Sequence, residues 1–67
     1  GTIFIESPQA RIQTITITDI AGKTVKQINP QANYLQIDLK NEPNGIYFVT
    51  VGTKTNSFVR KLIISSR

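Results

Sequence analysis

The stretch that decides the fold lies at residues 11–18 and reads RIQTITIT. Within it, Ile15 and Ile17 alternate with three threonines. Side chains of a β-strand point alternately to its two faces, so this pattern predicts a strand with one buried face and one wet face. Ile12 has the opposite parity, which indicates a bulge or bend near the start of the strand.

Similar stretches occupy most of the chain. Residues 34–39 alternate again and place Leu35, Ile37 and Leu39 on one face. The run at 46–51 is almost continuously apolar, which predicts a central strand buried on both faces. The other expected strands are residues 2–6, 23–28 and 57–64. Turn residues separate the strands about every ten residues and no helical crossover intervenes, so we expect a small antiparallel β-sandwich of six to seven short strands.

Composition agrees with an all-β fold and one small domain. Ile, Val and Thr account for 23 of the 67 residues, whereas Ala occurs three times and Met not at all. β-Branched side chains suit a pleated sheet better than a helix. We expect a single domain over residues 1–67, with modest stability because no disulfide or metal supports it. The start at Gly1, without an initiator Met, favours a domain cut from a longer protein.

The charge pattern favours a solvated surface. The chain has eight Lys and Arg residues and four Asp and Glu residues, which gives a net charge of +4. Of the basic residues only Arg60 and Lys61 adjoin, and neighbouring residues on a strand point to opposite faces. Because nucleic-acid binding needs clustered cations, no nucleic-acid partner is expected, although weak attraction to polyanions stays open. No apolar run approaches the ~20 residues of a membrane span, so no insertion into a membrane is expected.

No motif for catalysis or cofactor binding is present. The chain has no His and no Cys, which leaves neither the usual base of a hydrolase triad nor a thiolate metal ligand. The carboxylates are separated along the chain and form no calcium-binding run: Glu6, Asp19, Asp38 and Glu42. We therefore expect no catalytic residue, no cofactor and no metal. Asp38 should be solvated, and Asp19 should hydrogen-bond the backbone of the turn that follows it.

Five aromatic side chains could line a carbohydrate-binding face: Phe4, Tyr34, Tyr47, Phe48 and Phe58. Tyr47, Phe48 and Phe58 lie inside apolar runs, so we expect them in the core. Tyr34 follows a loop and is the best candidate for a half-exposed ring, as a carbohydrate-binding face would need.

Three segments in order resemble a known family. They are residues 15–25 with an Asp-x-x-Gly-Lys turn, residues 37–51 with an Asn-Gly-Ile-Tyr start to a strand, and residues 60–64 near the end. Together they are similar to the type A C-terminal sorting domain of the type IX secretion system of Bacteroidetes, over about residues 12–64. The residues on the family's turn and strand motifs are Asp19, Gly22, Lys23, Asn44, Gly45 and Tyr47. The start departs from the family, since Ser7-Pro8 only faintly matches its Asn-Pro-rich opening.

The resemblance implies an immunoglobulin-like sandwich that acts as a secretion signal and not as an enzyme. It implies that the domain ends a secreted cargo protein and directs it from the periplasm through an outer-membrane translocon, with shuttle proteins as partners. A sortase-like protease at the cell surface then removes the domain. A terminal edge strand can offer both side chains and free backbone groups to a partner. The expected contact residues on that strand are Arg60, Lys61, Leu62 and Ile63.

Other functions stay open from the residues alone. An Ig-like spacer or a carbohydrate-binding module of a surface protein would have a similar composition. Binding of a polyanion through the basic surface is a third hypothesis, and it would weaken as salt rises.

Overall fold

The computed structural model describes residues 2–65, and this part of the chain folds into six β-strands without a helix. The strands are β1 (Thr2–Glu6), β2 (Thr14–Asp19), β3 (Thr24–Ile28), β4 (Tyr34–Asp38), β5 (Gly45–Gly52) and β6 (Ser57–Ile64). Within these residues there is accordingly no helix with the length and apolar character that crossing a membrane requires.

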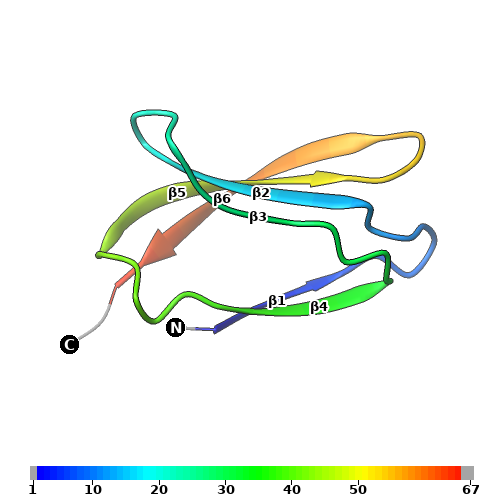
Figure 1. Cartoon of the computed structure of the whole chain (residues 1–67), viewed down its shortest axis with the longest axis horizontal. Helices are drawn as coiled ribbons and strands as arrows, with labels where there is room; N and C mark the ends of the chain where they lie inside the picture. Colours follow the sequence, from blue (N-terminus) through cyan, green and yellow to red (C-terminus); the bar gives the residue numbers. More distant parts are fainter. Residues whose placement is uncertain (1, 66–67) are drawn as a thin grey trace.

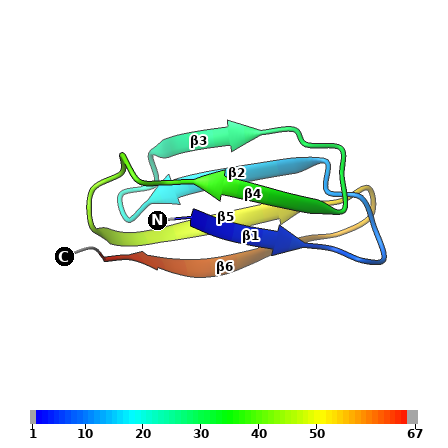
Figure 2. The same ribbon diagram turned by 90° about the horizontal axis from the view of Figure 1, so that it is seen from below.

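The strands form two sheets that pack face to face (Figure 1). The small sheet has the order β1-β4 and the large sheet has the order β3-β2-β5-β6, and every pairing is antiparallel. Figure 2 shows β1 and β4 lying over the middle of the large sheet, with β3 and β6 at its two margins. The predicted all-β, antiparallel sandwich is therefore confirmed, with six strands.

The core lies between the sheets and follows the alternation of the sequence. Ile15 and Ile17 of β2 are fully buried, whereas the threonines that alternate with them point away from the small sheet. Ile37 contributes from β4, and Leu39 follows directly after that strand. The complete set of buried apolar residues is Ile12, Ile15, Ile17, Ile37, Leu39, Tyr47, Val49 and Val51. The predicted buried faces of residues 14–18 and 34–39 are thus confirmed.

The predicted strand over residues 11–18 starts too early, because β2 begins at Thr14. Ile12 is fully buried but forms an isolated bridge with Ala32. Between them, the Gln13 N–H donates to the Gly52 carbonyl at 2.8 Å, while Thr14 is the register partner of the same Gly52. Two successive residues facing one is the arrangement of a β-bulge, which explains the reversed parity of Ile12.

The prediction that residues 46–51 are buried on both faces is wrong. Tyr47, Val49 and Val51 point into the core, but Phe48 between them is 36% exposed. The reason is that the small sheet covers only one face of the large sheet, so alternate residues of β5 meet solvent. Phe58 is also 36% exposed, since β6 lies at an uncovered margin, so the core prediction holds for Tyr47 and fails for both phenylalanines.

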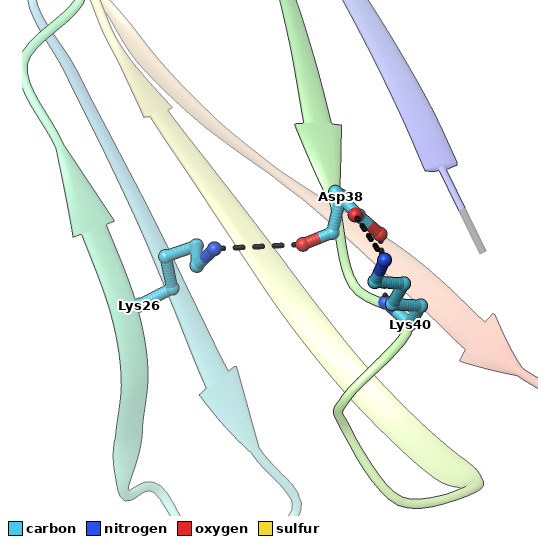
Figure 3. Close-up of polar contacts among 3 residues, drawn as sticks. All are labelled: Lys26, Asp38 and Lys40. Carbon is cyan, nitrogen blue, oxygen red and sulfur yellow. Dashed lines mark hydrogen bonds and ion pairs between the residues drawn. The ribbon is translucent and has the colours of Figure 1, made fainter.

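A polar contact ties the two sheets together at the β3 margin (Figure 3). The Lys26 Nζ donates to the backbone carbonyl of Asp38 at 3.4 Å. The Asp38 carboxylate accepts from the Lys40 N–H at 2.9 Å and lies 4.0 Å from the Lys40 Nζ. The Asp38 side chain is 55% exposed, which confirms its predicted solvated position. Such an exposed ion pair contributes only about 0–1 kcal/mol.

Candidate recognition surface on the last strand

The last strand, β6, has a free edge among the described residues, because β5 is its neighbour on one side only. The Thr53 N–H donates to the Asn56 carbonyl at 2.7 Å and closes the hairpin between β5 and β6. In an antiparallel ladder, bonded and non-bonded pairs alternate from that point. The backbone N–H and C=O groups of Val59, Lys61 and Ile63 therefore point to the free edge, where a partner strand can pair with them.

The four predicted contact residues do not share one face. Lys61 and Ile63 lie on the outer face of the large sheet, and Ile63 is 64% exposed. Arg60 and Leu62 lie on the inner face, where Leu62 packs against the core. The Arg60 guanidinium stacks over the Phe58 ring, with the Arg60 Cζ 4.9 Å from the ring centroid. A partner that reads the outer face therefore contacts only half of the predicted set.

An exposed apolar surface surrounds Lys61. Phe48 is its register partner on β5, and Ile46 lies opposite Ile63 one row further along. We define the outer patch as Ile46, Phe48, Val59, Lys61 and Ile63. Lys61 is its one charged member. Within residues 2–65 the ion pair that forms joins Lys40 to Asp38, so in this part of the chain no carboxylate lies within 4.0 Å of the Lys61 Nζ. The patch thus offers apolar contact around one cation.

The Asp-x-x-Gly-Lys turn is built for structure. The Asp19 carboxylate accepts hydrogen bonds from the N–H groups of Ala21 at 3.0 Å and Lys23 at 2.9 Å. Gly22 has φ 89°, a left-handed conformation that favours glycine. The predicted hydrogen bonds of Asp19 to the backbone of its turn are confirmed. The contact of Lys23 with Asp19 is made by the Lys23 backbone N–H.

The Asn-Gly-Ile-Tyr motif anchors the start of β5. Asn44 precedes the strand and Gly45 is its first residue. Tyr47 is 5% exposed, and its hydroxyl donates to the Pro43 carbonyl at 2.7 Å. Burial raises the pKa of Tyr47 above its ordinary value, and the negative charges of Glu42 and Asp19 raise it further. The motif therefore fastens the β4–β5 connection to the core.

Two features were not identified from the sequence. A groove of about 580 Å³ runs between β1 and β6. No local sequence pattern predicts it, because its walls come from strands that are far apart in the sequence. On the outer face of the small sheet, the rings of Phe4 and Tyr34 stack with centroids 6.2 Å apart. Tyr34 is 53% exposed, as predicted, and Phe4 is 61% exposed. In each strand the aromatic residue alternates with the apolar residues and shares a face with polar ones. This alternation predicts an exposed position for Phe4 as well as for Tyr34.

The described residues contain no group of three or more His, Cys, Asp or Glu side chains placed to hold a metal ion. The carboxylates that have contacts serve the fold: Asp19 caps its turn, and Asp38 binds the backbone and side chain of Lys40.

Comparison with protein families gives a match over nearly the whole chain. The model of the family described as "Secretion system C-terminal sorting domain" matches residues 1–65. The match begins upstream of residue 12, where the resemblance seen in the sequence begins, so it also includes β1. Searches of curated proteins and of solved structures gave no match.

Proposed function

The chain belongs to the family of type IX secretion system C-terminal sorting domains, and on this premise we propose that it ends a larger secreted protein and directs that cargo through the outer-membrane translocon. Membership in this family makes the chain a type IX sorting signal. It also implies interaction with the secretion machinery and export to the cell surface or beyond. The proposal adds the route, from the periplasm across the outer membrane, and assigns residues 1–67 to a single such domain.

The observation that carries the proposal is the combination of a free strand edge with the outer patch on β6. The backbone groups of Lys61 and Ile63 point to that edge, and their side chains lie on the outer face. A shuttle protein of the secretion machinery would add a strand to β6 and read both side chains. Leu62 holds β6 against the core, so it positions the strand without touching the partner.

The domain itself does no chemistry in this proposal. Its family is one of sorting signals, and the chain has neither His nor Cys to act as base or thiol nucleophile. After passage, a sortase-like protease at the cell surface separates the domain from its cargo. Such a signal needs a recognisable surface and no pocket of its own, which suits a small sandwich with an exposed edge on its last strand.

The test is to fuse residues 1–67 to the C-terminus of a periplasmic reporter in a host with a type IX system. Surface protease sensitivity and reporter size are the readouts. We expect a surface-exposed reporter that has lost the domain, and Lys61→Gln should leave more of it in the periplasm. Lys54→Gln, in the exposed β5–β6 hairpin, is the control for loss of one positive charge. A folded fusion that stays wholly periplasmic would contradict the proposal.

A second candidate function is favoured by the stacked pair of Phe4 and Tyr34. Two rings that are more than half exposed on one sheet face form a platform on which a sugar ring can lie. Retardation of the chain in gels that contain a soluble polysaccharide, abolished by Tyr34→Ala and kept in Lys61→Gln, would support a carbohydrate-binding module. Unchanged mobility in every polysaccharide gel would remove this candidate.

A further inference from the structure

The groove between the two sheets lies where the small sheet ends. Its lining residues are Ile3, Phe4, Ile5, Glu6, Val49, Val51, Phe58, Arg60, Lys61 and Leu62. They come from β1, from the inward face of β5 and from β6. The cause is the unequal width of the sheets, since the small sheet has two strands and the large sheet has four. In Figure 2, β6 extends past β1, and no other strand of the described residues lies beside β1 on that side. The groove therefore occupies the place of a third strand of the small sheet.

The edge of β1 that borders the groove has free backbone groups. The Ser7 N–H donates to the Asn33 carbonyl at 2.8 Å, which marks these two residues as a bonded pair of the β1–β4 ladder. By the alternation of an antiparallel ladder, Ile5 and Ile3 also bond to β4. The N–H and C=O of Phe4 then point away from β4, toward the groove. A segment laid along β1 would find a donor and an acceptor there.

The two margins of the large sheet differ in the contacts that their inward-facing basic side chains make. At the β3 margin, Lys26 reaches across to the small sheet and donates to the Asp38 carbonyl. At the β6 margin, Arg60 faces the groove, stacks on Phe58 and donates to its neighbour's carbonyl, that of Val59, at 3.2 Å. Within residues 2–65, Lys26 hydrogen-bonds the small sheet, whereas Arg60 makes no hydrogen bond to it.

Arg60 is the one cationic side chain on the inner face of β6 at the groove. Lys61 and Glu6 also border the groove, but their side chains lie on the outward-facing parity of β6 and β1. The ion pair found in the described chain involves neither cation, so Glu6 lies beyond 4.0 Å from both charged groups. An arginine that is already stacked on a ring keeps a planar fork of donors suited to a carboxylate. The complementary ligand is therefore apolar on the side that meets Phe58 and Leu62 and acidic where it meets Arg60.

We propose that this groove binds an extended segment of a partner protein, which adds to the small sheet beside β1 and places a carboxylate against Arg60. The segment alternates apolar and polar residues, so that its inward side chains cover Ile5, Val51 and Phe58. This surface is on the inner side of β6, opposite the outer patch, and the proposal does not rest on the sorting function.

The test uses the 67-residue chain and a capped heptapeptide of sequence TVTETVT, in which two valines and the central glutamate share one face. Binding is followed by amide NMR shifts and by hydrogen exchange. We expect saturable binding at peptide concentrations on the order of 1 mM, with new protection of the Phe4 amide. The peptide TVTQTVT, which lacks the carboxylate, should bind about tenfold more weakly, and Arg60→Gln should remove that difference.

A variant at β1 separates strand addition from other modes of binding. Phe4→Pro removes the N–H that points to the groove and leaves the bonds of Ile3 and Ile5 to β4 intact. It should weaken peptide binding about tenfold, whereas Phe4→Ala, which keeps the N–H, should retain it. Far-UV circular dichroism of both variants checks that the fold survives.

Several results would overturn the proposal. Equal binding of the peptide to Phe4→Pro and Phe4→Ala, or shifts confined to the outer patch, would place the peptide elsewhere. No shift at saturating peptide would show that the groove takes no strand. Protection of the Phe4 amide in the peptide-free chain that grows with protein concentration would assign the groove to a second copy of this chain.

Discussion

The hydroxyl of Tyr47 donates a hydrogen bond to the carbonyl oxygen of Pro43, across 2.7 Å and four residues of chain. The ring belongs to the core and the carbonyl belongs to the connection between β4 and β5. The Tyr47 side chain therefore joins the buried face of β5 to the loop that precedes this strand. This explains why a tyrosine, and not a phenylalanine, stands at the start of the strand.

The first prediction concerns stability at alkaline pH. The pKa of Tyr47 is raised from its ordinary value of 10.0, first by burial and then by the charges of Glu42 and Asp19. Above about pH 10, the unfolded chain loses this proton while the folded chain keeps it, so the free energy of unfolding falls as pH rises further. Below that pH both states hold the proton and the contribution is complete.

Tyr47→Phe lacks this proton and the hydrogen bond to Pro43. We expect the variant to be less stable than the parent near neutral pH, and the difference between them to shrink above about pH 10. Urea unfolding from about pH 8 to about pH 11 measures this. A stability difference that stays constant over that range would show that Tyr47 titrates at the same pH in both states.

The second prediction tests the turn between β2 and β3. Asp19→Ala removes the acceptor of the Ala21 and Lys23 N–H groups, and we expect a loss of about 1–2 kcal/mol in the free energy of unfolding. Asp19→Asn keeps an oxygen in the same place and should lose less. Equal losses in the two variants would mean that the negative charge, and not the hydrogen bonds, stabilises the turn.

The parts of this fold that the sequence predicts are those with a local cause. Alternation at Ile15 and Ile17 reports directly which side chains are buried, and Asp19 with Gly22 defines a turn through contacts within five residues. The exposure of Phe48 has a distant cause, since it depends on the absence of a layer over the outer face of the described sandwich. Hydrophobicity alone does not distinguish such a residue from Val49 beside it.

The candidate site shows the same limit. Alternation along β6 is enough to place Arg60 and Lys61 on opposite faces from the sequence alone. Which of them faces the small sheet depends on the register with β5. The groove beside β1 depends further on how two sheets of unequal width are superposed. Ile3 and Arg60 are 57 positions apart in the sequence, and no periodic pattern connects residues at that separation.

The third prediction tests the small core. Ile15→Ala removes a fully buried side chain, which costs about 2–5 kcal/mol. The whole stability of a chain this size is roughly 3–10 kcal/mol, at about 0.05–0.15 kcal/mol per residue, so the variant should lose a large share of it and unfold at a clearly lower temperature. Ile20→Ala is the control, because Ile20 is 74% exposed and its loss should change stability by less than about 0.5 kcal/mol. Thermal unfolding by circular dichroism compares them, and similar midpoints would contradict the packing described for β2.

The last prediction separates recognition from folding. Ile63 and Ile20 are both well exposed, at 64% and 74%, but Ile63 belongs to the outer patch and Ile20 to the β2–β3 turn. Because neither side chain is packed in the core, Ile63→Ser and Ile20→Ser should each change the free energy of unfolding by less than about 0.5 kcal/mol. In the reporter fusion, Ile63→Ser should lower the surface-exposed fraction and Ile20→Ser should leave it unchanged. An equal fall in both variants would point to a general loss of solubility or export competence, and no fall in either would move the recognition surface away from the outer patch of β6.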